Sequence, residues 1–358
     1  MRRLNHYIGK TVVAATFVVL LVVLSLTTIF AYLDQLADLK GSYDQWQAVI
    51  YVLLTLPGAI YENLPFVVLI GCLIGLGILA SGSELVVMRA AGISVRRIAW
   101  SVLRAMSLYI ILGLTLGEYV TPVTDQLAES RKALAQGRQN PFESTTGYWN
   151  REKNEFRHIN VVLPNGVLYG VSRYGFNEQQ ELEWISYAER ATYSDGKWLE
   201  EEGVVSHFST SDSADDKITK EAFTLKVWET ELSPKVLNVL VLPPEGLPMS
   251  SLFQYATYLD KQERQSANYW LSFWQKALQP LSTISLIFVA ISFVFGPLRQ
   301  VSMGFRIFSG VVVGITFSTS QNLLGPASVI FGFSPLLSVL LPIALCMAFG
   351  LYLIKRAG

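Results

Sequence analysis

The sequence holds few residues whose types and spacing could support catalysis. Gly9-Lys10-Thr11 matches the end of a phosphate-binding loop, but that loop needs a preceding strand and a glycine five positions earlier, where Leu4 stands. His6, His158 and His207 are scattered, and neither a His-Glu-x-x-His nor a Gly-x-Ser-x-Gly motif occurs. We therefore expect no catalytic residue, no metal site and no cofactor in this chain.

Charged side chains within the apolar stretches indicate no proton relay. Glu62, Glu118 and Lys276 each stand near the end of such a stretch, where contact with a membrane interface explains them. Cys72 and Cys346 lie inside apolar runs, which argues against a disulfide framework. Serines are plentiful in these runs, so a membrane-embedded hydrolase with an unrecognised nucleophilic serine stays open as an alternative.

One short polar segment carries a stronger signal. Ser81 and Glu84 have the Ser-x-x-Glu spacing of a capping box, which satisfies the first free amides of a helix. Gly92 suits the position just past a helix end, where the left-handed conformation is common. The spacing predicts a helix of roughly two turns near 83–92.

The side chains of this predicted helix suit docking to another protein. Leu85 and Met88, three residues apart, lie on one helical face next to Glu84 and Arg89. A short helix with apolar anchors and ionic flanks fits a groove on a partner. The alternative is a surface segment that packs on its own bundle.

The elements that must position this segment are strongly hydrophobic. Of 358 residues, 51% are hydrophobic and 16% charged, and the mean hydropathy is +0.37. Soluble domains average about 25% charged residues, so a disordered chain, a nucleic-acid-binding domain and an ordinary soluble enzyme are excluded as first interpretations. Residues 121–269 hold 22 acidic and 15 basic side chains, whereas the rest of the chain holds 6 acidic and 13 basic. This pattern indicates a membrane protein with a soluble insert.

Hydropathy predicts six membrane crossings, since a transmembrane helix needs about 20 mostly apolar residues. Thr11–Leu33 is the first, and its 23 residues are too many for the core of a cleavable signal. Two prolines and a glutamate interrupt the next apolar region, so we expect Tyr61–Ala80 to cross and Val49–Ile60 to lie obliquely at the interface. The other predicted spans are Val102–Val120, Leu271–Phe295, Phe305–Asn322 and Leu336–Ile354.

Positive charge sets the orientation, because Lys and Arg are retained in cytoplasmic loops. Of the 13 basic residues outside 121–269, 10 fall at the termini and in the second-to-third and fourth-to-fifth connections, including Arg299 and Arg306, and Arg104 lies one turn into the third span on the same side. The alternate connections are acidic or uncharged. We therefore expect cytoplasmic N- and C-termini and an external region over 121–269.

The external region is predicted to be all-β, because short strands alternate with turn residues. The turn at Pro164-Asn165-Gly166 and the strong hairpin signal Asp195-Gly196 separate the first four strands. The predicted strands are Glu155–Leu163, Gly166–Tyr174, Trp184–Ser194, Lys197–Ser209 and Ala222–Leu232, between a helical or irregular segment at Arg131–Phe142 and an amphipathic helix at Ser250–Gln265.

The predicted fold is therefore a membrane α-helical protein with an all-β domain inserted between helices three and four. Residues 1–120 contain helices one to three and the short helix near 83–92. Residues 121–269 form the external β domain with its connectors. Residues 270–358 contain helices four to six.

Several segments resemble a known family. Residues 83–94, Ser-Glu-Leu-Val-Val-Met-Arg-Ala-Ala-Gly-Ile-Ser, are similar to the coupling-helix signature of the LptF/LptG permeases of the lipopolysaccharide exporter. Tyr7–Thr11, Gly117–Pro122 and Phe293–Arg299 add matches, and the layout of three helices, a β insert and three helices also resembles this family. The resemblance covers essentially the whole chain and is strongest to the LptG branch.

The resemblance implies a function and a set of partners. The chain would be a non-enzymatic permease subunit in the inner membrane of a Gram-negative bacterium, with its insert in the periplasm as a β-jellyroll. It would pair with an LptF-like permease and an LptC-like single-pass protein on an LptB-like ATPase dimer that binds ATP and Mg. It would extract lipopolysaccharide from the outer leaflet and pass it toward a periplasmic LptA-like bridge.

The resemblance also implies roles for individual residues. Glu84 would make the charged contact with the ATPase groove, with Leu85 and Met88 as apolar anchors and Arg89 as an accessory ion pair. The family holds substrate phosphates with basic residues near the outer end of the first helix, but residues 31–38 contain no Lys or Arg. The substitute candidates are Lys40, Arg131 and Lys132, for which ordinary contact with lipid headgroups is an equal alternative.

A membrane sensor is a further interpretation that stays open on sequence alone. Such a sensor would bind a ligand with its external β domain and recruit a regulator with its cytoplasmic loop, without an ATPase.

Gly71 and Gly75 lie four residues apart on the second span, and we expect them to serve close helix packing rather than gating.

Overall fold

The computed structural model describes residues 2–136, 148–152, 154–163, 166–194, 196–208, 218–228, 230, 243–261, 265–296 and 301–357. The contacts divide the chain into two compact units. The first comprises Met1–Phe30, Leu56–Pro122 and Pro248–Gly358, and the second comprises Ala31–Thr55 and Val123–Leu247.

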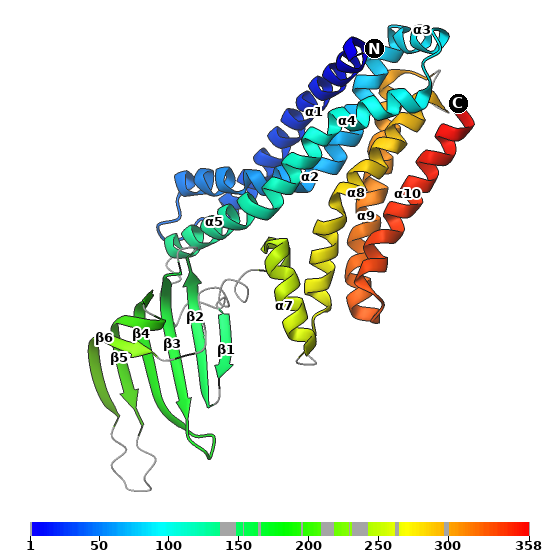
Figure 1. Ribbon diagram of the computed structural model, residues 1–358. Helices are drawn as coiled ribbons and strands as arrows, with labels where there is room; N and C mark the ends of the chain where they lie inside the picture. The colour runs from blue at the N-terminus through cyan, green and yellow to red at the C-terminus, as the bar shows by residue number, and fades with distance from the viewer. Residues whose placement is uncertain are drawn as a thin grey trace. The chain divides into compact units, whose positions relative to one another are not determined.

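The described helices confirm the predicted membrane architecture. Six helical stretches in the described residues are long and apolar enough to cross a membrane, namely α1, α2, the α4–α5 run, α8, α9 and α10 (Figure 1). The bounds are α1 Arg2–Ala37, α2 Gln45–Ser81, α3 Glu84–Ala90, α4 Val95–Thr115, α5 Thr121–Ala135, α7 Met249–Lys261, α8 Ala267–Phe295, α9 Met303–Phe331 and α10 Pro335–Ala357, with a short 3₁₀ turn η2 at Pro244–Gly246.

The predicted span Tyr61–Ala80 and the segment Val49–Ile60 before it form one continuous helix, which agrees with the prediction of a single crossing, and the oblique position of 49–60 at the interface stays a prediction. α2 contains Pro57 and Pro65, and a proline removes the hydrogen bond to the carbonyl four residues earlier. For Pro65 that carbonyl belongs to Tyr61, and it accepts a hydrogen bond from the Gln279 side chain of α8 at 2.8 Å. A side chain from a neighbouring helix thus satisfies the freed group, which lets the helix continue through the membrane.

The helical run that contains the third span continues past Val120. α4 continues through a π-helical turn, η1 (Leu116–Val120), into α5. Glu118 in that turn accepts hydrogen bonds from the backbone amides of Met249 at 2.7 Å and Ser250 at 3.3 Å. The carboxylate therefore caps the start of α7, where the helix dipole favours negative charge.

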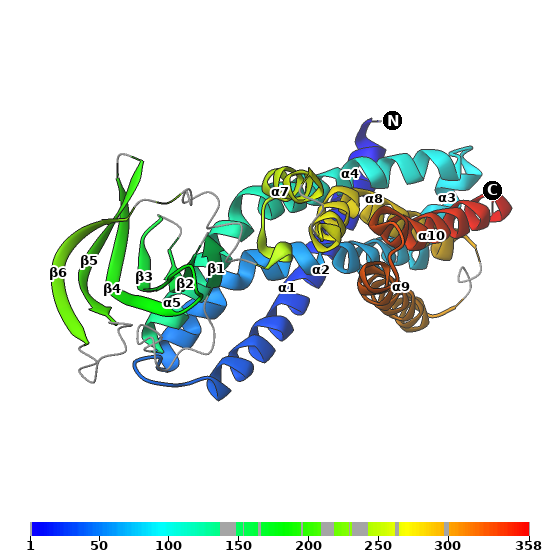
Figure 2. The same cartoon turned by 90° about the horizontal axis from the view of Figure 1, so that it is seen from below.

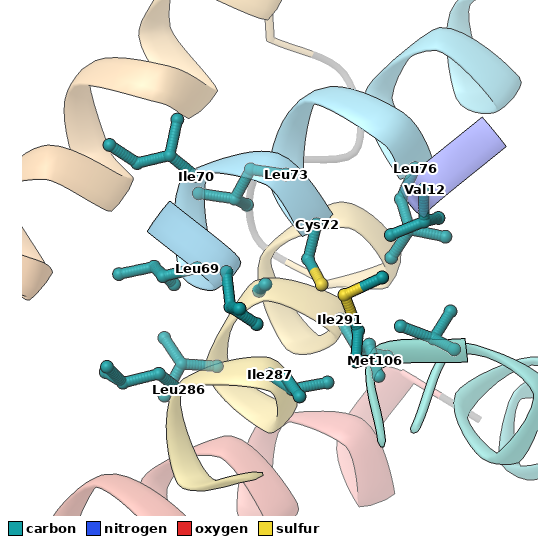
Figure 3. Close-up of a cluster of buried hydrophobic side chains, with 14 of the residues drawn as sticks. Val12, Leu69, Ile70, Cys72, Leu73, Leu76, Met106, Leu286, Ile287 and Ile291 are labelled. Atoms are coloured by element: carbon teal, nitrogen blue, oxygen red, sulfur yellow. The ribbon is translucent and has the colours of Figure 1, made fainter. Parts of the chain in front are cut away.

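The first unit has one apolar core. α1, α2, α4 and α8 all contribute side chains, including Val12, Cys72, Met106 and Ile287 (Figure 3). α8 packs beside α9 and α10, as both ribbon views show (Figures 1 and 2). α3 lies at the end of this unit that carries the two chain termini (Figure 1).

Two glycines let α1 and α2 approach closely. A Cβ atom on Gly75 would come within 2.7 Å of the Cα of Val12, and one on Gly71 would overlap the backbone and side chain of Thr16. These contacts confirm the predicted role of the two glycines in close helix packing.

Replacing Gly71 with Ala is expected to destabilise the bundle by about 1–3 kcal/mol, because the overlapping Thr16 backbone has no room to move. Gly77→Ala is the matched control, since the nearest atoms to a Cβ there lie 3.9 Å away. Thermal unfolding of the full chain in detergent measures both. Equal melting temperatures for the two variants would contradict the packing account.

The second unit contains a six-stranded antiparallel sheet, which confirms the predicted all-β insert. The described strands pair in the order β1-β2-β3-β4-β5-β6, a meander rather than the Greek-key order of the expected jellyroll. The strands are β1 Tyr148–Glu152, β2 Glu155–Val162, β3 Leu168–Phe176, β4 Leu182–Ser194, β5 Lys197–His207 and β6 Thr219–Trp228 (Figures 1 and 2).

The register confirms the two predicted turns. Ser194 pairs with Lys197 around Gly196, whose φ is +82°, and Val162 pairs with Leu168 around Gly166, whose φ is +80°. Both glycines adopt the left-handed conformation that such turns require.

Some predicted features lie outside the described residues. These are Pro164, Asn165, Asp195, Ser209, Arg299, residues 137–142 of the segment after the third span, residues 229 and 231–232 of the last predicted strand, and residues 262–264 of the helix after the sheet.

Candidate functional site

The short helix α3 forms as predicted, but its start differs from the predicted capping box. α2 runs through Ser81, so only Gly82 and Ser83 remain to turn the chain. Ser83 takes the N-cap position with a φ of 60°, in the left-handed region, and makes no side-chain capping hydrogen bond. Ser81 belongs to the preceding helix and caps nothing in α3.

The end of α3 matches the prediction. The amide of Gly92 donates to the carbonyl of Arg89 at 3.0 Å, and the amide of Ile93 donates to the carbonyl of Met88 at 3.1 Å. Gly92 has a φ of +82°. This pair of hydrogen bonds is the Schellman motif, which closes the last turn of a helix with glycine in the left-handed conformation.

The apolar face of α3 is turned toward its own bundle. Leu85 and Met88 are 4% and 8% exposed and belong to the core of the first unit. The expectation that these two side chains act as accessible docking anchors is therefore corrected, because residues three apart share the face that packs inward. Val86 and Val87, 48% and 66% exposed, are the apolar side chains that α3 offers outward.

Glu84 and Arg89 flank this outward face. The Glu84 Oε1 atom accepts a hydrogen bond from the hydroxyl of Tyr7 on α1 at 3.0 Å. Arg89 lines a hollow of about 420 Å³ between α3 and the ends of α2 and α8. The other lining residues are Ala80, Leu85, Val86, Ala90, Val294 and Phe295. The four predicted residues of α3 are thus brought together, two as packing residues and two beside the exposed valines.

In the second unit, Lys132 is engaged within the chain. Its ammonium lies 2.7 Å from the Asp38 carboxylate, and its Nζ sits 5.9 Å from the Tyr43 ring centre and 5.0 Å from that of Tyr51. Ion pairing and ring contacts of this kind hold a lysine in place. Lys132 therefore fastens the α1–α2 connection to α5.

The aromatic partners of Lys132 are fixed as well. Burial, with the charges of Asp38 and Glu129, raises the pKa of Tyr43 to about 12. The Tyr43 hydroxyl stays protonated at neutral pH and donates to Gln35 Oε1 at 3.0 Å.

The other two basic candidates, Lys40 and Arg131, are exposed and face solvent or lipid. The aromatic partners of Lys132 carried no signal in the sequence.

The sheet holds a cluster of buried charges that the sequence reading missed. Arg157 on β2 lies opposite Arg173 on β3. Both arginines donate to Glu155 Oε1, at 2.8 and 2.6 Å, and Arg173 also donates to both oxygens of Glu200 at 3.2 Å. The guanidinium carbons lie 5.1 and 5.3 Å from the ring centre of Trp228. The carboxylates neutralise two like charges that share one face of the sheet.

The comparisons with known proteins bear on the whole chain. Residues 6–356 match the family model described as lipopolysaccharide export system permease LptF/LptG. The chain belongs to this family. The permease is 34% identical over 358 residues to the lipopolysaccharide export system permease protein LptG of Escherichia coli strain K12, covering 99% of this chain and 98% of the relative. It is 33% identical over 356 residues to the protein of the same name from Haemophilus influenzae, with the same coverage.

These matches confirm the family that the sequence motifs indicated. With six long apolar helices among its described residues, the permease is a multi-pass membrane protein. Among the described residues, no group of three or more His, Cys, Asp and Glu side chains could hold a metal ion.

The charge cluster of the permease predicts an acid-sensitive sheet. Although burial alone would raise it, hydrogen bonds from Arg173 and Arg157 hold the pKa of Glu155 below its ordinary value of 4.5. A carboxylate with a lowered pKa contributes stability above its unfolded pKa and loses it as pH falls through the folded pKa. The stability advantage of the parent over Glu155→Gln should be full at pH 7 and shrink below pH 4.5.

Hydrogen exchange of the β2 and β3 amides in the full chain measures this advantage. The ratio of variant to parent exchange rates at each pH removes the intrinsic effect of pH on exchange. A ratio that stays constant from pH 7 to pH 3.5 would contradict the assigned role of Glu155.

Proposed function

We propose that this chain is a permease subunit of an ATP-driven exporter that extracts lipopolysaccharide from the outer leaflet of the inner membrane. The observation that carries the proposal is the family match over residues 6–356, together with two relatives aligned over nearly their full length. A match of this extent includes α3, the sheet and the six candidate membrane helices of the described residues.

Charge supports the orientation. The chain termini and α3 lie at one end of the first unit (Figure 1). Eleven of the 13 basic residues outside 121–269 belong to the termini, to the second-to-third connection with the start of the third span, and to the fourth-to-fifth connection. Retention of Lys and Arg in cytoplasmic loops supports a cytoplasmic position for this end. With six crossings, the insert between the third and fourth spans then lies in the periplasm, where it passes lipopolysaccharide toward an LptA-like bridge.

The cytoplasmic end presents α3 to an LptB-like ATPase dimer, which binds ATP and Mg. Glu84 supplies the charged contact, and the exposed Val86 and Val87 supply apolar contact beside the hollow lined by Arg89. Leu85 and Met88 hold α3 against the bundle, so a push on α3 is transmitted to the membrane helices. The permease itself carries no hydrolytic role.

The membrane helices differ in the share of their residues that is buried within this chain. In the span windows of α2 and α8, 67% of residues are buried, against 28% for α1 and 17% for α9. Apolar side chains exposed on α1 and α9 need lipid or another protein as cover. An LptF-like permease packed against these helices, with an LptC-like single-pass protein, accounts for that exposure and encloses a cavity for lipid.

The substrate chemistry requires both the apolar cavity and the ATPase. Removing acyl chains from a bilayer costs about 0.8 kcal/mol for each buried CH₂ group that becomes exposed. A cavity lined by apolar helices lowers that cost, and ATP hydrolysis supplies the remaining work. Lys40 and Arg131, both exposed in the second unit, are the candidates for contact with the phosphates.

Coexpression with candidate subunits tests the proposal. Purification in mild detergent through a tag on this chain should recover a second permease and an ATPase with vanadate-sensitive activity. Recovery of the intact chain without any ATPase would contradict the proposal and favour a membrane sensor that recruits a regulator instead.

A further inference from the structure

We propose that Tyr7 of α1 is a positioning residue for Glu84: it orients the glutamate for its partner and ties the first membrane helix to that contact. The proposal rests on the role of α3 proposed above and adds the residue that sets the geometry of its charged group. The hydrogen bond from the Tyr7 hydroxyl to Glu84 Oε1, 3.0 Å long, is the observation that carries it.

α3 alone leaves the Glu84 side chain unoriented. Glu84 is the first residue of a helix of seven, and the preceding Ser83 makes no side-chain capping hydrogen bond. Gly82, the residue before Ser83, has no side chain to pack against the carboxylate. Within the described part of the chain, Tyr7 is the side chain that the structure places in hydrogen-bond contact with Glu84.

The backbone at Tyr7 is held in place by its neighbours, although the Tyr7 side chain is 46% exposed. The next residue, Ile8, is 1% exposed and belongs to the apolar core, as does Val12 one turn further on. A Cβ atom on Gly9 would lie 3.1 Å from the Cβ of Ala105 on α4, so this turn of α1 packs tightly. A rigid ring with two side-chain torsions then carries the hydroxyl to Glu84 at little entropic cost.

The chemistry of the donor matters as much as its position. A phenol donates a hydrogen bond without carrying charge, so it orients the carboxylate and leaves its negative charge intact. Oε1 accepts the hydrogen bond from Tyr7, and none of the described residues donates to the second oxygen, Oε2, which we assign to a cationic group on a partner. An arginine or lysine at position 7 would instead neutralise the charge that the partner needs.

The same contact ties α3 to the start of the first membrane helix. α1 is continuous from Arg2 to Ala37, with Tyr7 near its start. A displacement of Glu84 by a bound partner therefore moves or strains the start of α1 directly. Tyr7 joins the partner-binding helix to the span that is among the least covered by its own chain.

Titration of the ATPase onto the permease pair in nanodiscs tests the proposal. Tyr7→Phe removes only the hydroxyl and is expected to raise the Kd of the ATPase by about threefold to tenfold, as expected for a hydrogen bond to a partly exposed charged group. Tyr352→Phe is the matched control, since Tyr352 is 62% exposed on α10 near the C-terminus. It should leave the Kd unchanged.

A double-mutant cycle separates positioning from mere packing. In a Glu84→Ala background, Tyr7→Phe should change the Kd by less than about twofold, because the group it acts through is gone. An equal effect of Tyr7→Phe in both backgrounds, or no effect in the parent, would overturn the proposal. If Glu84→Ala itself leaves the Kd unchanged, the coupling role of α3 fails, an outcome distinct from failure of Tyr7 alone.

Discussion

Glu84→Ala is expected to weaken binding of the ATPase by about 2–5 kcal/mol, roughly thirtyfold or more in Kd. Most of this loss comes from the cationic mate, which is left in a partly dehydrated groove without its counter-charge. Glu84 is positioned for this role by the Tyr7 hydroxyl and by the packing of Leu85 and Met88 beneath it. Copurification of the ATPase through a tag on this chain, followed by titration, measures the change.

A control glutamate separates this effect from general loss of charge. Glu178, exposed in the connection between β3 and β4, lies in the second unit, and Glu178→Ala should leave ATPase binding unchanged. Undiminished ATPase affinity in Glu84→Ala would contradict the assignment of α3 as the contact.

Arg173→Ala is expected to destabilise the sheet by about 3–5 kcal/mol. Its guanidinium donates to Glu155 at 2.6 Å and to Glu200 at 3.2 Å, and the side chain of Glu200 is fully buried. Burial already raises the pKa of Glu200, and Arg173 offsets only part of that shift. Without Arg173, the buried Glu200 loses the arginine that donates to it, and Glu155 keeps only Arg157. Hydrogen exchange of the β2–β5 amides in the full chain should accelerate by a factor of about a hundred or more.

A surface arginine in the same sheet supplies the comparison. Arg190 lies 3.8 Å from Glu201, and the two side chains are 46% and 31% exposed. Solvent screens such a pair, so Arg190→Ala should cost less than about 1 kcal/mol. Similar exchange rates in the two arginine variants would show that burial does not decide the strength of these pairs.

Hydropathy and charge predicted the membrane architecture, because a span must be long and apolar whatever surrounds it. They could not reveal contacts between residues that are far apart in the sequence. At Pro65, the carbonyl of Tyr61 that loses its helical hydrogen bond accepts one from Gln279, which is more than two hundred positions away. Nothing in the sequence around Gln279 indicates this contact. The extension of the third span into α5 involves the carboxylate of Glu118 and amides from beyond the insert.

The candidate site was predictable in composition but not in orientation. The glycine at position 92 fixed the end of α3, since its Schellman geometry is local. Periodicity placed Leu85 and Met88 on one face but could not say whether that face meets a partner or its own bundle. The arginine pair was within reach: the turn predicted at 164–166 sets a register in which Arg157 faces Arg173, and two facing cations require carboxylates.

The central claim is that this chain moves lipopolysaccharide at the expense of ATP. Its most direct test is reconstitution of the chain with a second permease and the ATPase into vesicles loaded with labelled lipopolysaccharide, with a soluble acceptor outside. The account predicts transfer of the label to the acceptor that requires ATP and stops with vanadate. Vanadate-sensitive ATP hydrolysis by an intact complex without any transfer of label would contradict it.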